Sequence, residues 1–173
     1  THPHPDHIGG LLNEEGMLTF PNASYFIWEE DWTFWFSKKA YDLTHKAFVD
    51  IARKYLTSIK DKVTLLDSEG EVLPGINVMK APGHTPGHMV IQIQSGDEQL
   101  IYIGDTVLHT LHLEKTDWLP VYDIVPDQAN VSKHKVFNYA AQNKAWIVGQ
   151  HFIPFPSLGH VRKQDEGWHW ISV

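Results

Sequence analysis

Short apolar stretches ended by turn-forming residues recur along the chain, and their lengths are typical of β-strands. Two of them, MVIQIQ and QLIYIGD, alternate apolar and polar residues on either side of SGDE, which predicts a β-hairpin over residues 89–105. The turn-rich stretch SEGEVLPG (68–75) is predicted to be a connection. The other predicted strands are SYFIW (24–28), KVTLLD (62–67), INVMKAP (76–82), AWIVG (145–149) and WHWISV (168–173).

Helical spacing of apolar residues is found in three other parts of the chain. EEDWTFWF (29–36) has this spacing, and PDQANVSKHKVFNYAAQN has a proline near its start, which suits the first turn of a helix over roughly 127–142. Residues 41–58 predict a longer helix with one apolar stripe facing the core. That stripe consists of Phe48, Ile51, Tyr55 and Ile59. Because strands and helices are mixed, the predicted class is α/β or α+β with packed layers.

Length and charge narrow the classes of function. The 173 residues suit one domain with a substantial core, so residues 1–173 are predicted to form a single domain. A net charge of -7 argues against nucleic acid, which needs a basic surface, and against attachment to a membrane surface. The apolar runs are too short to span a bilayer. We expect a soluble protein with a small-molecule substrate. A homodimer and the compartment, bacterial-type cytoplasm or periplasm, are left open.

The chain has no cysteine but 12 histidines. The absence of thiols excludes disulfides, Fe–S clusters, thiolate zinc sites and cysteine nucleophiles. Four of the candidate metal ligands stand in the opening loop, THPHPDHIGG, where an H-x-H-x-D-H spacing is typical of metal ligands. In an extended loop, residues 2, 4 and 6 would point the same way. These four are His2, His4, Asp6 and His7.

Further histidine and aspartate residues follow predicted strands. His84 and His88 lie in APGHTPGH between two strands, Asp105 directly follows LIYIG, and His151 follows AWIVG and precedes a proline-rich turn. Each is a weak signal alone, because a single histidine after a strand is more often a capping or hydrogen-bonded residue. Together, however, they place chemistry-bearing side chains on loops at strand ends, where ligands are commonly presented.

Five histidines and two aspartates are enough for two metal ions. A hydrolytic zinc takes three protein ligands and keeps one position for water, so seven ligands divide into two such sites if one carboxylate bridges. Imidazole suits zinc, iron or nickel, whereas a magnesium or calcium site would use oxygen ligands. Two adjacent metals can hold a hydroxide and bind a substrate oxygen. The residues therefore predict a dinuclear metallohydrolase.

The order of these motifs resembles that of the metallo-β-lactamase-fold hydrolases. H-x-H-x-D-H, GHTPGH, an aspartate after a hydrophobic strand and a histidine before a proline-rich turn occur in that order. FPNASYFIWEEDWTFW and QHFIPFPSLGHV, with GWHW, look like segments of the branch that contains N-acyl-homoserine lactonases and methyl parathion hydrolase-like enzymes. The resemblance covers nearly the whole chain and implies a four-layer αββα sandwich.

The resemblance also implies roles for individual residues. One metal would be bound by His2, His4 and His84, and a second by Asp6, His7 and His151. Asp105 would bridge both, together with a hydroxide that attacks the carbonyl carbon or phosphorus. Asp6 could also orient the hydroxide, and His88 would support a ligand. We expect two divalent ions per chain, zinc foremost, with iron, manganese, cobalt or nickel as alternatives.

Departures from neighbouring branches narrow the expected activity. True zinc β-lactamases commonly have a cysteine where this chain has Asp105, so antibiotic hydrolysis is not expected. Too few residues follow His151 for the helical C-terminal domain of glyoxalase II-type thioesterases. In the family, sheet strands precede the H-x-H-x-D-H loop, and the resemblance therefore implies that Thr1–Val173 is a C-terminal fragment of a longer domain that lacks those strands.

Other residues have two readings each. His109 could bind substrate or protonate the leaving group as a catalytic residue, or it could simply be a surface histidine. His160 could support the metals or lie apart from them. Trp118 and Tyr122 are candidate pocket residues. The aromatic run is predicted to be core or interface rather than a substrate wall; it consists of Trp28, Trp32, Phe34, Trp35 and Phe36.

The predicted function is hydrolysis of a small ester-like bond in a lactone, a carboxylic ester or a phosphotriester. A metal-bridging hydroxide would be the nucleophile, with Asp6, Asp105 and His109 as the catalytic residues. Two alternatives remain open. One is a glyoxalase II-like thioesterase, and the other is a truncated domain that binds metal without turnover.

Overall fold

The computed structural model describes residues 1–173, which divide into two compact units. The N-terminal unit comprises His2–Ser68, and the C-terminal unit comprises Glu69–Val173 together with Thr1. Both contain strands and helices, so the predicted mixed α/β class is confirmed.

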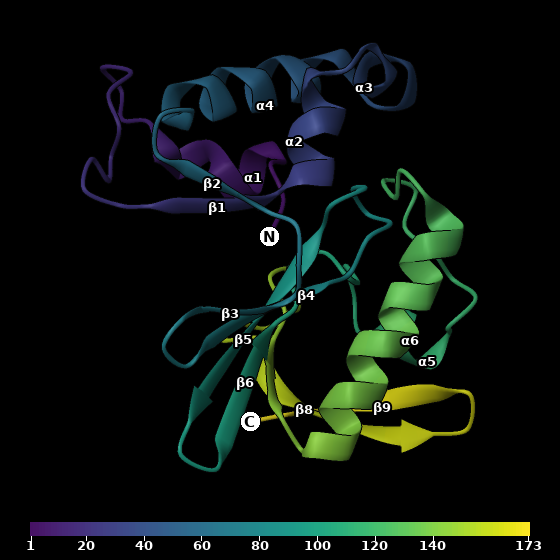
Figure 1. The fold of residues 1–173 in the computed structure, drawn as a ribbon. Coiled ribbons are helices and arrows are strands. Elements are labelled where there is room, and N and C mark those ends of the chain that lie inside the picture. Colours follow the sequence, from purple (N-terminus) through teal and green to yellow (C-terminus); the bar gives the residue numbers. More distant parts are fainter. The chain divides into compact units, whose positions relative to one another are not determined.

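The N-terminal unit is built on a two-stranded parallel sheet with helices packed on it (Figure 1). β1 pairs with β2 so that Tyr25 lies opposite Val63 and Trp28 opposite Leu66. Because parallel neighbours need a crossover, the helices between the two strands form that connection. The elements of this unit are α1 (Pro5–Ile8), the 3-10 turn η1 (Gly9–Leu11), β1 (Tyr25–Trp28), α2 (Glu29–Phe36), α3 (Lys38–Leu43), α4 (Lys46–Ile59) and β2 (Val63–Leu66).

The helix predicted over 41–58 is two helices, α3 and α4. The backbone is extended at Thr44 and His45, and the His45 imidazole accepts a hydrogen bond from the N–H of Ala47 at 3.3 Å. A side-chain acceptor at this position satisfies one of the free N–H groups of a new helix, so the chain starts α4 there instead of continuing α3. The apolar periodicity of the sequence did not reveal this break.

The core of the N-terminal unit contains Trp28 and Trp35, which have no exposed surface. The buried face of α4 is offset by one residue from the predicted stripe, which was correct only at Ile59. Val49, Ala52 and Leu56 are the other buried positions, and the larger Phe48, Ile51 and Tyr55 are only partly buried. The buried face is therefore apolar throughout but includes the small Ala52, whereas the two aromatic residues of the predicted stripe lie at its margin.

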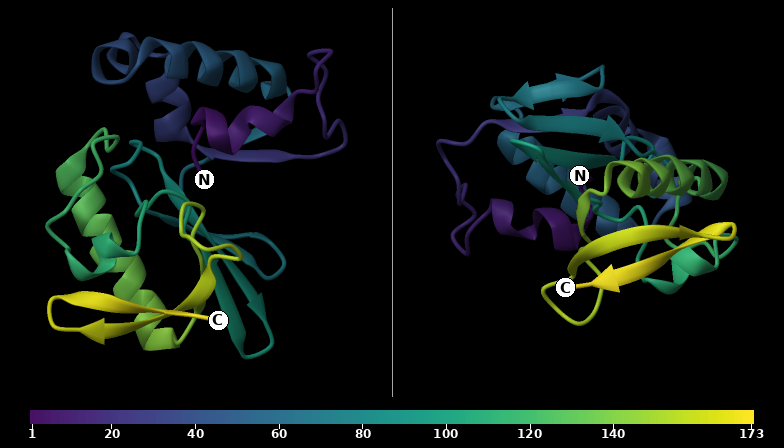
Figure 2. Two further views of the ribbon diagram at one scale, coloured as in Figure 1. Left: turned by 180° about the vertical axis from the view of Figure 1, so that it is seen from behind. Right: turned by 90° about the horizontal axis from the view of Figure 1, so that it is seen from below.

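The C-terminal unit is built on one seven-stranded sheet whose strands lie in sequence order, β3 to β9 (Figures 1 and 2). All neighbouring pairs are antiparallel except β6 and β7, which are parallel and are connected through α5 and α6. The elements are β3 (Gly70–Leu73), β4 (Ile76–Lys80), β5 (Met89–Ser95), β6 (Glu98–Tyr102), α5 (Leu111–Glu114), α6 (Pro126–Asn143), β7 (Trp146–Val148), β8 (Leu158–Gln164) and β9 (Gly167–Ser172).

Two segments of this sheet were not predicted as strands. The stretch SEGEVLPG, predicted as a connection, contains β3, which forms a hairpin with β4 despite its glycine and proline neighbours. β8 follows the proline-rich turn, and its sequence LGHVRKQ has little apolar alternation. Both strands are stabilised by pairing with an apolar neighbour rather than by their own pattern.

The core of the C-terminal unit lies between the sheet and α6, which covers one face of the sheet (Figures 1 and 2). Ile101 and Ile147 of the sheet and Val136 and Phe137 of α6 have no exposed surface, and Trp168 of β9 is equally buried. Each such side chain contributes roughly 1.5–3 kcal/mol by leaving water. No helix of the structure is long and apolar enough to cross a membrane.

Gly83 lets the loop between β4 and β5 pass close to the start of α6. Its φ is +135°, and a Cβ at this position would lie 2.1 Å from the backbone nitrogen of Ala129. The N–H of Val125, the residue before α6, donates to the Gly83 carbonyl at 2.8 Å. Only glycine combines this conformation with this approach.

We therefore expect Gly83→Ala to lower the free energy of unfolding by roughly 2–5 kcal/mol, because it adds both backbone strain and a backbone clash. Gly96→Ala is the matched control, because Gly96 also has a positive φ (+58°) but has open space at the Cβ position. It should cost only about 1–2 kcal/mol. Urea unfolding followed by circular dichroism measures both. Equal losses in the two variants would contradict the close packing at Gly83.

Candidate metal centre

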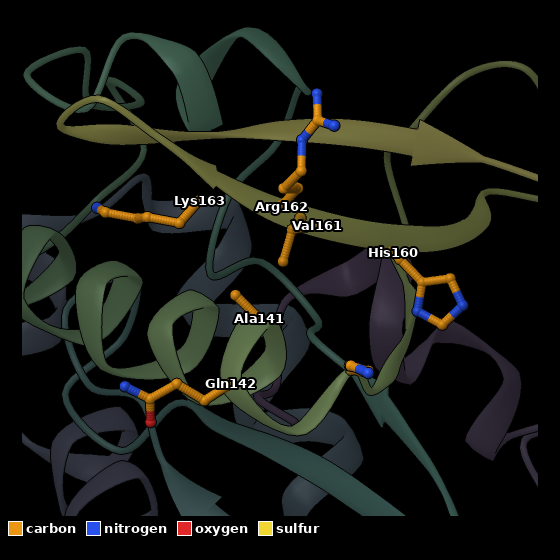
Figure 3. A pocket seen from close by; sticks show the side chains of 7 residues that line it. Ala141, Gln142, His160, Val161, Arg162 and Lys163 are labelled. Atoms are coloured by element: carbon orange, nitrogen blue, oxygen red, sulfur yellow. The ribbon is translucent and has the colours of Figure 1, made fainter.

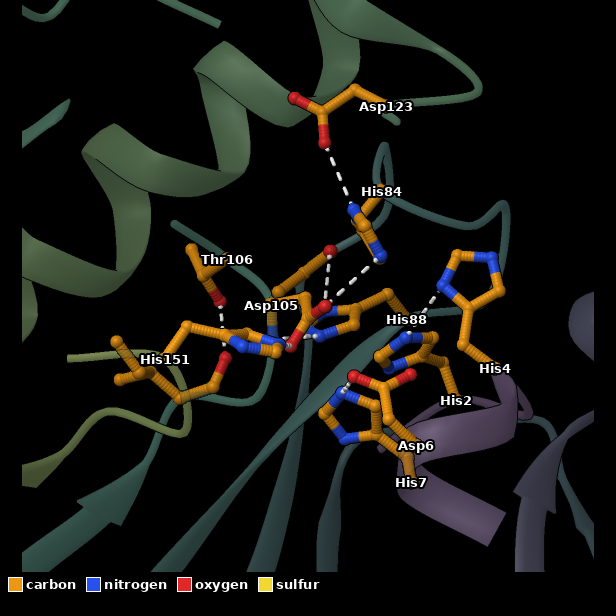
Figure 4. Close-up of polar contacts among 12 residues, drawn as sticks. His2, His4, Asp6, His7, His84, His88, Asp105, Thr106, Asp123 and His151 are labelled. Carbon is orange, nitrogen blue, oxygen red and sulfur yellow. Dashed lines mark hydrogen bonds and ion pairs between the residues drawn. The ribbon is translucent and has the colours of Figure 1, made fainter. Parts of the chain in front are cut away.

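The opening loop brings its four candidate ligands together within the N-terminal unit (Figure 4). His4 is extended (φ −71°, ψ 153°), and α1 begins at Pro5, which is pre-organised for a first helical turn. The Nε2 atom of His2 lies 3.0 Å from Nδ1 of His4. The predicted extended alternation therefore ends at His4, and Asp6 and His7 take their directions from the helical turn instead.

Further contacts join His7 to His2 and Asp6, and His4 to Trp35. The rings of His2 and His7 have centroids 4.2 Å apart, and Nε2 of His7 lies 3.5 Å from Oδ2 of Asp6. The ring of His4 meets Trp35 edge to face at 5.5 Å. A ring held by an aromatic neighbour has few alternative orientations, so the group is pre-organised. The contact with His4 also gives Trp35, one member of the aromatic run, a structural role.

The sheet of the C-terminal unit brings three more candidate ligands to one edge. β4 ends and β5 begins at the same edge because the two strands are antiparallel, and β6 ends there for the same reason. β7 is parallel to β6, so it ends at that edge too. The loops after β4, β6 and β7 carry His84, Asp105 and His151 respectively.

Asp105 lies between two of these histidines (Figure 4). Its Oδ2 atom is 3.2 Å from Nε2 of His84, and its Oδ1 atom is 3.3 Å from Nε2 of His151. Two ligand atoms on a tetrahedral zinc with bonds of about 2.0–2.1 Å are about 3.3–3.4 Å apart. Both distances fit a pair of ligands on one ion, and each carboxylate oxygen faces a different histidine. The donor set in this unit therefore fits a bridging carboxylate.

Asp123 orients His84 from the other side of the ring. Its Oδ1 atom lies 3.0 Å from Nδ1 of His84, and both side chains are almost fully buried. The N–H of Ile124 also donates to the His84 carbonyl at 3.2 Å. A carboxylate on the distal nitrogen fixes the ring orientation and raises the basicity of the other nitrogen, as at many zinc-binding histidines.

Two carboxylates determine the charge of His84. Burial by itself would lower the pKa of its imidazole, but Asp105 and Asp123 outweigh burial and raise the pKa to about 9. The site thus favours a positive charge at Nε2. A proton meets that preference in the metal-free protein, and a metal cation meets it equally well.

His88 supports the backbone of Asp105. Its Nε2 atom accepts a hydrogen bond from the Asp105 N–H at 3.0 Å, and its Nδ1 lies 3.0 Å from the Ala81 carbonyl, which accepts the ring N–H. Complete burial is the main reason that the pKa of His88 lies well below its usual value. Gly104 (φ +49°) permits this approach, because a Cβ there would lie 2.8 Å from Nε2 of His88.

Sequence reasoning missed Asp123. It stands in DWLPVYD, 18 residues after Asp105 and 39 after His84, with no spacing that marks it as a partner. A signal was nevertheless present, because an acid three residues before the long helix that begins at Pro126 lies near the end of a loop. Only the folded structure shows that this loop returns to the edge of the sheet where His84, Asp105 and His151 lie.

The remaining predicted residues occupy other positions. His109 is exposed, and its Nδ1 accepts a hydrogen bond from the N–H of Leu111 at 3.0 Å at the start of α5. Nδ1 of His160 lies 3.0 Å from the carbonyl of Ala145, and its ring stacks on Trp146 at 3.8 Å. These contacts give His160 a packing role beside β7. The catalytic role of His109 stays a prediction.

The aromatic candidates divide by burial. Trp28, Phe34 and Trp35 are buried, which confirms the core interpretation for them, whereas Phe36 is 40 % exposed. Trp118 and Tyr122, which were candidate pocket residues, are exposed on the segment between α5 and α6.

A pocket of 520 Å³ lies elsewhere, between the end of α6 and β8 (Figure 3). It shares no residue with the candidate ligands. Arg162 and Lys163 contribute to its lining but point in different directions, so their charges do not converge on one bound group (Figure 3). We therefore locate the chemistry at the ligand edge.

Solved structures with the same fold include several hydrolases. The dizinc quorum-quenching lactonase AidC, solved with a product, is 32% identical with a TM-score of 0.90 over 99% of this chain and 62% of that chain. The hydrolase AbOPH is 28% identical with a TM-score of 0.88, over 99% of this chain and 62% of its own. A probable metal-dependent hydrolase from Staphylococcus aureus is 25% identical with a TM-score of 0.79, over 100% and 60%.

A curated relative has a different description. The protein avaE of Aspergillus versicolor, named as a candidate transcription factor, is 29% identical over 110 residues, or 61% of this chain and 31% of that protein. The chain thus spans less than two thirds of the length of each of these relatives.

These hydrolases agree with the enzyme class expected from the sequence. The model of the metallo-beta-lactamase superfamily matches residues 1–151, and this range includes every candidate metal ligand. The chain therefore belongs to the metallo-beta-lactamase superfamily.

Proposed function

We propose that this chain is the ligand-bearing part of a dinuclear metal-dependent hydrolase that acts on a small ester-like substrate: a lactone, a carboxylic ester or a phosphotriester. AidC, a dizinc lactonase, and AbOPH, a hydrolase, support this class, since both match nearly the whole chain. The absence of cysteine supports it as well, because thiol-based catalysis has no residue to use.

The observation that carries the proposal is the position of Asp105 between His84 and His151, with one carboxylate oxygen toward each imidazole. A structural salt bridge needs one cationic partner for a carboxylate, whereas a bridging carboxylate directs one oxygen toward each of two metal ions, beside the other ligands of those ions. The Asp123 carboxylate behind His84 adds the outer hydrogen bond that zinc-binding histidines commonly make.

The proposal draws on the donors of both units. In each unit the histidine nitrogens converge: His2 and His4 in one, and His84 and His151 through Asp105 in the other. The ligands we propose for the first ion are His2, His4 and His84; for the second Asp6, His7 and His151; and for both Asp105.

The residues of this chain would have different roles in hydrolysis. Divalent ions bound there supply Lewis acidity toward the substrate oxygen and lower the pKa of water. The Asp6 carboxylate, whose side chain is 55% exposed, would accept a proton at its oxygen. His109, whose Nδ1 is occupied by Leu111, would present Nε2 as the proton donor to the leaving group. Asp123 and His88 would hold His84 and Asp105 in place.

Metal analysis and a substrate panel test the proposal directly. Protein loaded with zinc should contain about two ions per chain and should hydrolyse at least one class among lactones, aryl esters and phosphotriesters. Preference for thioesters would favour the glyoxalase II-like alternative instead. Two bound ions without turnover on any class would favour a metal-binding domain.

Asp105→Ala should reduce the metal content from about two ions per chain to fewer than one, because both ions would lose a ligand. Activity should fall with it. Atomic absorption of zinc-loaded, desalted protein measures the content. Asp97→Ala in the β5–β6 turn is the matched control and should retain both ions. Near-normal metal content and rates in the Asp105 variant would refute the bridging assignment.

Asp123→Asn should weaken zinc affinity by about 10–100-fold, because the amide cannot raise the basicity of His84 as the carboxylate does. Competition with a chromogenic chelator measures the change. Asp165→Asn, in the turn between β8 and β9, is the control and should leave the affinity unchanged. An unchanged affinity in the Asp123 variant would show that this carboxylate only packs against the ring.

A further inference from the structure

The ring of His4 contacts one aromatic side chain from each of two helices in the N-terminal unit, α2 and α4 (Figure 1). Trp35 of α2 meets the imidazole edge to face with ring centroids 5.5 Å apart, and Phe48 of α4 is tilted against it at 5.4 Å. His4 itself is only 5% exposed. In a close-packed interior a ring follows its neighbours, so the orientation of this imidazole depends on how α2 lies against α4.

Trp35 has no polar contact that would hold its ring. It is fully buried, yet its indole N–H has no hydrogen-bond partner within the protein. A buried indole N–H usually finds an acceptor, and an unsatisfied one contributes no fixed direction to the ring. The position of the Trp35 ring therefore depends on packing and on the backbone of α2 that carries it.

Arg53 of α4 holds that backbone. Its Nε donates to the carbonyl of Trp35 at 2.7 Å, and its Nη2 donates to the carbonyl of Ser37 at 2.8 Å. These two carbonyls lie where α2 ends and α3 begins, and the last carbonyls of a helix have no partner inside the helix. A guanidinium can satisfy two acceptors at once in a fixed geometry. Arg53 thus joins the end of α2 to α4 at the residue that contacts His4.

The guanidinium is itself held by Tyr41 of α3. The guanidinium carbon of Arg53 lies 4.5 Å from the centroid of the Tyr41 ring, and the Tyr41 hydroxyl donates to Oδ1 of Asp50 on α4 at 2.8 Å. A cation over an aromatic face is attracted to it and has fewer orientations. Arg53 therefore contacts all three helices between β1 and β2.

We propose that Arg53 is a positioning residue for the metal centre: by holding the carbonyls of Trp35 and Ser37 against α4, it sets the orientation of the His4 imidazole. Arg53 contacts none of the candidate ligands and acts on His4 through Trp35. This inference rests on the proposed function, in which His4 is a ligand of the first ion, and it adds a residue outside the ligand set.

The first test is the zinc affinity of Arg53→Met, measured by competition with a chromogenic chelator. Methionine keeps an apolar stem but cannot donate to either carbonyl, so the affinity should fall about tenfold. Arg53→Lys should lose less, because an ammonium can still donate to one of the two carbonyls. Lys54→Met, at the next and exposed position of α4, is the matched control and should equal the wild type. Unchanged affinity in Arg53→Met would overturn the proposal.

A second comparison separates positioning from a loss of stability. Ile59→Ala removes a buried side chain at the last residue of α4 and should lower the melting temperature while leaving the zinc affinity at 25 °C unchanged. The visible absorption of the cobalt-loaded protein reports coordination geometry, and it should change in Arg53→Met but not in Ile59→Ala. Equal effects of the two variants on affinity and spectrum would reduce Arg53 to a stabilising residue. If Arg53→Met does not fold, Arg53→Lys decides the comparison.

A measurement on the metal-free protein separates this inference from the proposed function. Ring currents of Trp35 and Phe48 displace the NMR signal of the His4 ring protons, which are identified by their absence in His4→Gln. In Arg53→Met this displacement should shrink, whereas Lys54→Met should retain it. Such a result in a protein that neither binds zinc nor hydrolyses any substrate would retain the role of Arg53 while the proposed function fails. An unmoved His4 signal in Arg53→Met, in a protein whose wild type binds zinc and turns over, would do the reverse.

Discussion

A single carboxylate with an imidazole on each oxygen is the interaction on which the chemistry of this molecule depends. Asp105 meets His84 and His151 at 3.2 and 3.3 Å, and no other carboxylate of the C-terminal unit faces two histidine nitrogens in this way among the ion pairs of that unit. Without a cation, such a group would be a small buried cluster with a strong preference for added positive charge. That preference is one that a bound cation would satisfy, which is why the cluster is a candidate metal site.

Much of the fold around Asp105 serves to hold it still. His88 bonds its backbone N–H, and Gly104 leaves the space for that ring. Asp123 holds the neighbouring ligand His84, and the loop with Gly83 rests against α6. These contacts involve no reacting group, yet they limit the positions of the ligand atoms. A bridging ligand tolerates little movement, because one displacement changes two coordination distances.

The candidate ligands could be predicted from the sequence more readily than the residues that hold them in place. His84, Asp105 and His151 could be predicted because each follows an apolar strand, and strand ends at one edge must lie together once the order of the strands is known. Asp123, Arg53 and the caps at His45 and His109 could not, because each acts through a contact distant in sequence or through one local hydrogen bond. The strands β3 and β8 were missed for a similar reason, since pairing rather than periodicity stabilises them.

The order of the strands in the seven-stranded sheet has a consequence for how the C-terminal unit folds. Three of its six strand pairs, β3–β4, β5–β6 and β8–β9, are joined by two-residue turns, and the β4–β5 and β7–β8 pairs by the loops 81–88 and 149–157, so these five can form early from local contacts. The pairing of β6 with β7 alone must close a long connection, and that connection contains Asp105, Asp123 and α6. His151 follows directly. Loop closure of this kind is the slow event in such topologies, so Asp105 should face His84 before it faces His151, whose position depends on β7.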